Sequence, residues 1–225
     1  MFLNLVSHQH TLSHNLPYLS RHQPNYAFDN ESTHNYSLSW NMKQKYLKDQ
    51  KIYCVGDSHV SLFTGLNTIA SYWPSKAISI LPQFSVFHLG PVLAYNIVEK
   101  KSSTGFYDKI SEVLERNIPP SSWVLLSSGE IDCRAHLIKQ AQHNNSSFEE
   151  VAEICVDRYF DGIEKLMQTG HKFIIYNAIP STRKNKTDTA FPSYGNCKER
   201  NEITMLFNKF SQNKCTSLKI IFFVF

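Results

Sequence analysis

The sequence contains no apolar run near the roughly 18 residues that a membrane-spanning helix needs, and its start lacks the positive flank of a signal peptide. Neither sign of charge dominates: 23 Lys and Arg stand against 19 Asp and Glu, and a net charge of +4 argues against nucleic acid as a partner. The five cysteines are odd in number and form no C-x-x-C pair, so no zinc site or disulfide framework is predicted. Unpaired thiols fit a reducing compartment such as the cytoplasm.

Two regions of different composition are present. Residues 1–49 are rich in His, Asn, Ser and Tyr and show no sustained apolar period, which predicts a disordered polar extension. A metal site on its histidines would need two or three of them fixed in one geometry. From residue 50 to 225, short apolar runs alternate with longer amphipathic ones, which predicts a single domain. Cys54 and Cys155 fall within apolar patterns there and are expected to be buried thiols.

The apolar runs of residues 50–225 predict five strands: Lys51–Val55, a run within 78–89, Trp123–Ser127, Lys172–Ala178 and Leu218–Phe225. Helical spacing predicts helices at Ser58 to about Tyr72, Phe106–Asn117, Ser147 to about Gly170, and 197–213. Strands that alternate with helices indicate an α/β fold with a parallel sheet. The prediction is a three-layer α/β/α sandwich around a flavodoxin-like five-stranded parallel sheet. Functional sites in such sheets form at the carboxyl ends of the strands.

The first strand is followed by Gly56-Asp57-Ser58-His59. A serine in this strand-to-helix turn lies at the positive end of the next helix, where its hydroxyl faces the crevice and its N–H can stabilise an oxyanion. The alternative is that Asp57 or Ser58 only caps the helix. No G-x-G-x-x-G pattern follows this strand, which argues against a nucleotide-binding protein of the same topology.

Glycines and charged residues follow the next two strands. Gly90 comes after the second, where its N–H could be a second oxyanion donor or where it could form an ordinary turn. The third is followed by Gly129, Glu130, Asp132 and Arg134. Ionisable groups at the end of a buried strand are costly unless paired or used, so they indicate a site, or an Asp132–Arg134 ion pair that fixes a loop.

Over roughly residues 50–225, the sequence resembles the GDSL/SGNH hydrolases in three of their four conserved blocks. These blocks are Gly-Asp-Ser, a single Gly, and Gly-x-x-Asp, and each follows a predicted strand in that order. The resemblance implies hydrolysis of a small ester or an acylated carbohydrate, without a metal or organic cofactor. It makes Ser58 the nucleophile and gives oxyanion donors in the N–H groups of Ser58 and Gly90. Asp132 and Arg134, in the third block, are predicted to be further catalytic residues, with Asp57, Gly129 and Glu130 as supporting residues.

The sequence departs from the family at two places. Ile131 occupies the position of an asparagine whose side chain is an oxyanion donor, and such a donor is worth on the order of 3 kcal/mol. The family's Asp-x-x-His block, which supplies the base, occurs nowhere in the 225 residues. We therefore expect a form truncated before that block. His59 is expected to point away along its helix, His88 and His136 to be structural or exposed, and His171 to lie at the opposite end of the sheet.

Two functions remain open. The first is a serine ester hydrolase of the SGNH type, with Ser58 as the nucleophile. The alternative is a hydrolase-like remnant or binding module without catalysis, which Ile131 and the missing Asp-x-x-His favour. The oligomeric state is not indicated by the sequence.

Overall fold

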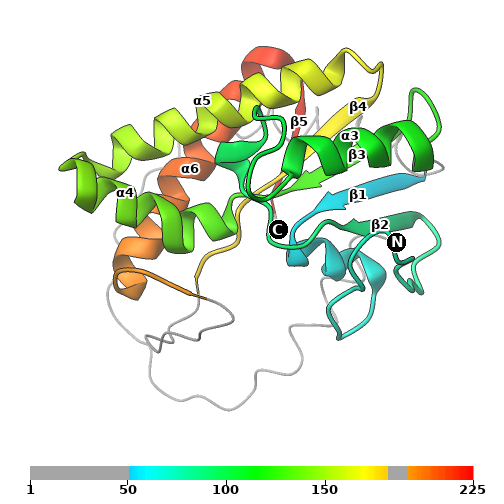
Figure 1. Ribbon diagram of the computed structural model, residues 1–225, viewed down its shortest axis with the longest axis horizontal. Coiled ribbons are helices and arrows are strands. Elements are labelled where there is room, and N and C mark those ends of the chain that lie inside the picture. The colour runs from blue at the N-terminus through cyan, green and yellow to red at the C-terminus, as the bar shows by residue number, and fades with distance from the viewer. Residues whose placement is uncertain (1–50, 182–191, 225) are drawn as a thin grey trace, which may run out of the picture. The chain divides into compact units, whose positions relative to one another are not determined.

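The computed structural model describes residues 51–181 and 192–224, and the predicted extension over residues 1–49 lies outside them. The α/β class with a five-stranded parallel sheet is confirmed, in the strand order β2-β1-β3-β4-β5 (Figure 1). The strands are β1 (Ile52–Gly56), β2 (Phe84–His88), β3 (Trp123–Ser127), β4 (Lys172–Tyr176) and β5 (Ile221–Phe223). The helices are the 3₁₀ helices η2 (Ser58–Thr64) and η3 (Ala94–Asn96), the π-helical turn η4 (Asp132–His136), and α3 (Phe106–Asn117), α4 (Leu137–Asn144), α5 (Phe148–Met167) and α6 (Cys197–Leu218).

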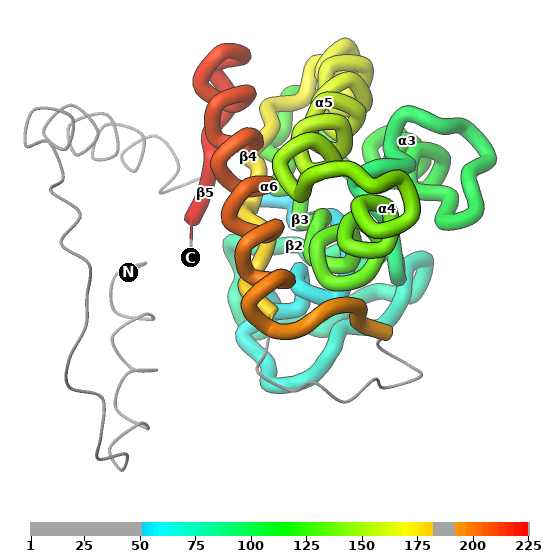
Figure 2. Tube along the Cα trace, turned by 90° about the vertical axis from the view of Figure 1, so that its left-hand side faces the viewer, coloured from blue at the N-terminus to red at the C-terminus, as the bar shows by residue number. Residues whose placement is uncertain are grey.

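The sheet is covered unequally on its two faces. Successive strand residues point to opposite faces, so Tyr53 and Val55 pack toward the α-helices while Ile52 and Cys54 pack toward η2. All four α-helices contribute to the first of these cores, and α5 and α6 lie side by side within that layer (Figures 1 and 2). The second core is closed by η2 and by side chains of the segment that leads to β2.

Most predicted elements are present, with shifted ends. α3 has the predicted bounds, and α5 begins where predicted because the Ser147 side chain accepts a hydrogen bond from the Glu150 N–H at 3.1 Å. α6 continues five residues past the predicted end at 213, to Leu218, and ends at Lys219 with a positive φ of 57°. The last strand is therefore shorter than predicted. Cys54 and Cys155 are buried free thiols, as expected.

The predicted helix from Ser58 to about Tyr72 is wrong. The chain forms the seven-residue 3₁₀ helix η2 and leaves it at Gly65, which has φ of 74°. A side chain at Gly65 would place its Cβ 2.8 Å from the Ile80 side chain, so glycine is required at this turn. Leu66 and Ile69, which suggested a buried helical face, are 37% and 60% exposed. Three helical elements, η3, η4 and α4, lie outside the helices that were predicted from the sequence. None of the helices in the described ranges is long and apolar enough to cross a membrane.

Candidate active site

The strand register brings the three sequence blocks together. β1 lies between β2 and β3, and its last residue, Gly56, is aligned with His88 on one side and with Ser127 on the other. The segments that follow these three strands therefore leave the sheet at the same level and at its carboxyl edge. Asp57-Ser58-His59, Leu89-Gly90 and Ser128-Gly129-Glu130 are neighbours for this reason.

Ser58 is half-buried and is the first residue of η2. Its backbone N–H has no acceptor within the helix, because the first N–H groups of a helix point outward from its end. In the described part of the chain, no hydrogen bond engages the Ser58 hydroxyl. Both groups are thus available to a ligand at the carboxyl edge of the sheet.

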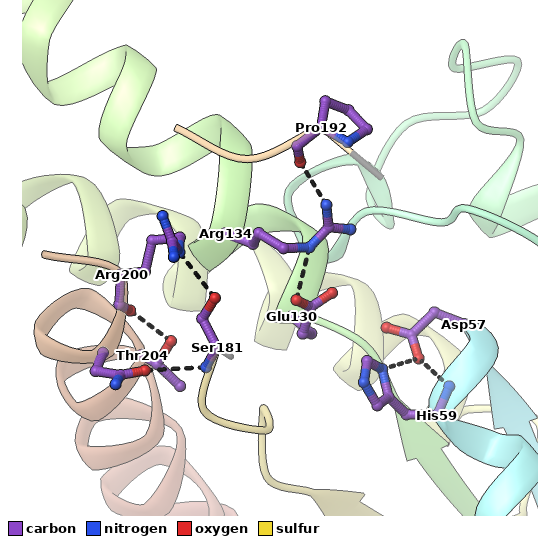
Figure 3. A network of polar contacts seen from close by, with 9 residues as sticks. Asp57, His59, Glu130, Arg134, Ser181, Pro192, Arg200 and Thr204 are labelled. Atoms are coloured by element: carbon purple, nitrogen blue, oxygen red, sulfur yellow. Dashed lines mark hydrogen bonds and ion pairs between the residues drawn. The ribbon is translucent and has the colours of Figure 1, made fainter. Parts of the chain in front are cut away.

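Asp57 and His59, on either side of Ser58, form a hydrogen-bonded pair (Figure 3). Asp57 is 1% exposed, and its Oδ1 accepts from the His59 backbone N–H at 2.9 Å and lies 3.1 Å from His59 Nδ1. Ser127 Oγ is a more distant donor to the same oxygen, at 3.4 Å. The alternative of an Asp57 cap on the helix is therefore realised, but His59 does not point away as expected: its ring turns back to the carboxylate that caps the helix.

The ionisation of His59 is set by competing effects. Burial lowers the pKa of the imidazole, while the hydrogen bond to Asp57 and the negative charges of Asp57 and Glu130 raise it. Arg134 lowers it slightly, and the net result is a pKa above the ordinary value for histidine. The side chain is 26% exposed, so it remains accessible to solvent.

Gly90 follows β2 with φ of 84° and is buried. No acceptor for its N–H occurs among residues 51–181 and 192–224. The carbonyl of the same peptide unit, at Leu89, accepts a 3.0 Å hydrogen bond from the Lys109 ammonium on α3. An ammonium on the carbonyl fixes this peptide and increases the positive character of its N–H. Nothing in the sequence indicated Lys109, which lies 20 residues away on a helix face.

Glu130 and Arg134 form the ion pair of the third block (Figure 3). Arg134 Nε donates to Glu130 Oε1 at 2.7 Å, and its Nη1 donates to the carbonyl of Pro192. Both side chains are largely buried, with exposures of 15% and 13%. The alternative pair of Arg134 with Asp132 is wrong, because η4 turns the Asp132 side chain toward η3 instead.

Asp132 is fully buried and accepts backbone hydrogen bonds from Ala94 N–H at 2.8 Å and from Tyr95 N–H at 3.3 Å. The pKa of this carboxyl is raised to about 6, mainly by burial and to a smaller extent by the negative charge of Asp57. The two backbone donors act in the opposite direction. Asp132 thus fixes the loop that carries Gly90. Gly129, just before it, lies against the Phe207 ring.

Three other histidines, His88, His136 and His171, make no hydrogen bond with Ser58 in the described part of the chain. His88 is buried, and its Nδ1 lies 2.7 Å from the Ala70 carbonyl. His136 lies on η4 with its side chain partly exposed, and the desolvation of the rest of the ring, together with the nearby cations Lys139 and Arg134, lowers its pKa. His171 precedes β4 at the opposite end of the sheet, as predicted.

The described residues offer no cluster of metal ligands. In the ranges 51–181 and 192–224, no group of three or more His, Cys, Asp or Glu side chains could hold a metal ion. A groove of about 550 Å³ runs beside the edge strand β2, where its lining includes Tyr53, Trp73, Phe84 and Phe87. None of the predicted site residues lines this groove.

No protein-family model and no curated protein matches the chain. Several solved structures resemble it at low sequence identity. The aryl esterase of M. smegmatis has a TM-score of 0.48 at 13% identity, over 78% of this chain and 84% of that chain. Est24, a carbohydrate acetylesterase from Sinorhizobium meliloti, has a TM-score of 0.46 at 13% identity, over 78% and 84%. Phospholipase A1 from Streptomyces albidoflavus NA297 has a TM-score of 0.41 at 11% identity, over 77% and 78%. Likeness at this level assigns no activity or substrate to the chain.

Proposed function

We propose that the protein is a serine ester hydrolase of the GDSL/SGNH type, in which Ser58 forms a transient acyl-enzyme. The observation that carries the proposal is the position of Ser58, half-buried at the first turn of η2, where β1 ends level with β2 and β3. Its hydroxyl and N–H have no hydrogen-bond partner within the described chain, and neither has the N–H of Gly90 at the same edge of the sheet. A nucleophile beside two free backbone donors is the arrangement that acyl transfer needs.

In the proposed reaction, Ser58 Oγ attacks the acyl carbon of the ester. The negative charge that develops on the carbonyl oxygen is stabilised by the N–H groups of Ser58 and Gly90. Collapse of this intermediate releases the alcohol, and water then hydrolyses the acyl-enzyme. Asp132 and Lys109 act as positioning residues, because they hold the backbone on either side of Gly90.

Glu130 and Arg134 are proposed to shape the wall of the crevice rather than to bind the oxyanion. Arg134 donates to Glu130 and to the Pro192 carbonyl, so it does not replace the amide that Ile131 lacks. The proposed substrates are small esters, including O-acetyl groups on carbohydrates, and no cofactor takes part.

The experiment is activity-based labelling with a fluorophosphonate, which reacts with activated serines. We expect one adduct, located at Ser58 by mass spectrometry, together with hydrolysis of p-nitrophenyl acetate. Ser58→Ala should abolish both, while Ser71→Ala, in an exposed stretch of the loop after η2, should leave both unchanged. Labelling or turnover that survives in Ser58→Ala would contradict the proposal.

The second candidate is a binding module without catalysis. Ile131 in place of the family's asparagine favours it, because that side chain cannot donate a hydrogen bond. In that case the folded protein would show neither labelling nor turnover. Acetylated oligosaccharides would still bind in calorimetry, and a bulky replacement such as Ser58→Trp would weaken that binding.

A further inference from the structure

The Asp57–His59 contact fixes which nitrogen of the imidazole carries a proton. Asp57 Oδ1 accepts a hydrogen bond from the His59 backbone N–H, so this oxygen acts as an acceptor, and Nδ1 at 3.1 Å is its second donor. The neutral ring therefore has its proton on Nδ1 and its lone pair on Nε2. A carboxylate that orients a histidine through Nδ1 leaves Nε2 ready to accept a proton, which is the relation found in Ser-His-Asp triads.

We propose that His59, oriented by Asp57, is the general base of the Ser58 crevice. The inference rests on the proposed hydrolase function and adds to it the group that moves the proton. It differs from the pattern that the sequence resemblance implied, in which the base comes from a separate Asp-x-x-His block.

Burial and charge both support this assignment. Asp57 is shielded from solvent, whereas His59 keeps about a quarter of its side chain exposed. A buried carboxylate favours a positive charge on its histidine partner, so the imidazolium that forms during the reaction is stabilised. Ser127 Oγ lies behind the pair, and the other charged groups that act on His59 are Glu130 and Arg134. These last two oppose each other, so Asp57 is the dominant charged partner of the ring.

The proton moves in a closed cycle. Side chains of adjacent residues diverge, and no hydrogen bond joins Ser58 Oγ to His59 among the described residues. The proposed transfer therefore runs through one bridging water molecule. As Oγ bonds to the acyl carbon, its proton passes through this water to Nε2. His59 then returns the proton to the departing alkoxide when the carbon–oxygen bond of the ester breaks. In the second half, a water attacks the acyl carbon, Nε2 takes its proton, and that proton goes to Oγ as Ser58 leaves.

Substitution of His59 provides the first test. With p-nitrophenyl acetate we expect His59→Gln to lower kcat by about 100-fold or more, the usual range for loss of a general base. His136→Gln, on the exposed side of η4, is the matched control and should keep wild-type kcat. Added imidazole should restore part of the turnover of His59→Ala, after subtraction of the rate of Ser58→Ala/His59→Ala in the same buffer. A role of His59 in stability alone predicts no rescue.

Asp57→Asn provides the second test, through pH. A base is active when deprotonated, so activity rises with pH through the pKa of His59. Because Asp57 raises that pKa, its removal should move this acidic limb to lower pH and lower the plateau. Nitrogen-15 NMR of the imidazole, which needs no turnover, should show the Nδ1–H tautomer in the wild type and its loss in Asp57→Ala, which removes the accepting oxygen.

The outcomes separate the two proposals. Loss of labelling and turnover in Ser58→Ala, with unchanged kcat and pH profile in His59→Gln, would overturn His59 as the base and leave the hydrolase standing. Turnover that persists in Ser58→Ala, or no turnover in the wild type, would overturn both. Loss of activity in His59→Gln without imidazole rescue of His59→Ala, and with no change of the acidic limb in Asp57→Asn, would reduce His59 to a structural role.

Discussion

Asp132 Oδ2 accepts a 2.8 Å hydrogen bond from the backbone N–H of Ala94, so the end of β3 is tied to a loop 38 residues earlier in the chain. The carboxylate has no exposed surface, and its second oxygen accepts from the Tyr95 N–H. This contact holds the turn between Gly90 and η3. The third sequence block is thus joined to the segment after the second block by hydrogen bonds from backbone N–H groups to the Asp132 side chain.

The burial of the Asp132 carboxyl predicts a specific dependence of stability on pH, because burial raises its pKa against the effect of the two backbone donors. Its carboxyl has a pKa of about 6 in the folded protein, raised from 3.8, so the folded state binds this proton more tightly than the unfolded state. The stabilising contribution is complete below about pH 4 and is lost as pH rises through 6. A shift of this size corresponds to about 3 kcal/mol.

Comparison with Asp132→Asn isolates that contribution from those of other carboxyls. Urea unfolding between pH 4 and 7 should show that the wild type loses more stability across this range than the variant. The exposed Asp161→Asn should follow the wild type. Parallel curves for wild type and Asp132→Asn would contradict the raised pKa.

Lys109→Met should reduce turnover without unfolding the protein. The ammonium holds the Leu89–Gly90 peptide through its carbonyl, and loss of this contact frees the Gly90 N–H to turn away from the oxyanion. We expect kcat for p-nitrophenyl acetate to fall about tenfold, less than for complete loss of an oxyanion donor, with KM nearly unchanged. Lys109→Arg should recover most of the loss, and the exposed Lys165→Met on α5 is the control. A lower melting temperature at normal kcat would indicate a structural contact only.

Glu130→Gln should move the acidic limb of the pH–rate profile to lower pH. Glu130 raises the pKa of His59, so its neutralisation lowers that pKa, while the lowering effect of Arg134 remains. The amide oxygen of the introduced glutamine can still accept from Arg134 Nε, which keeps the geometry. Glu112→Gln breaks a comparable but exposed pair with Arg116 on α3 and should leave the profile in place. An unchanged acidic limb in Glu130→Gln would show that Glu130 does not affect the pKa of His59.

The sequence predicted the strands well, because buried parallel strands are continuous apolar runs. The first four of them also end at, or just before, glycine or a polar residue. It failed between Ser58 and Tyr72. There Leu62, Leu66 and Ile69 have helical spacing, yet each is exposed, and the turn at Gly65 is set by its contact with Ile80 and Leu81, which are distant in sequence. Periodicity contains no information about such a contact.

Two side-chain pairings at the candidate site were not predicted. The spacing of Asp132 and Arg134 suggested an ion pair, whereas η4 separates them and pairs Arg134 with Glu130, one helical turn earlier. The orientation of His59 was also missed. An aspartate two residues before a histidine at a helix start could have indicated it, because a capping carboxylate can accept from both the backbone and the ring.

Two glycines with positive φ provide a last test, of the packing beneath the site. Gly129 (φ 105°) and Gly170 (φ 80°) both strain an added side chain, but only at Gly129 would the new Cβ lie 2.6 Å from the buried Phe207 ring; at Gly170 it would meet nothing within 4 Å. Gly170→Ala should therefore cost about 1 kcal/mol of unfolding free energy, the conformational strain alone. Gly129→Ala adds overpacking and should cost about 3 kcal/mol or more. Phe207→Ala is itself destabilising, so the double variant should be more stable than the sum of the two single changes predicts. Additive losses in urea unfolding would show that Phe207 does not confine Gly129, and that the β3 end is held by its backbone conformation alone.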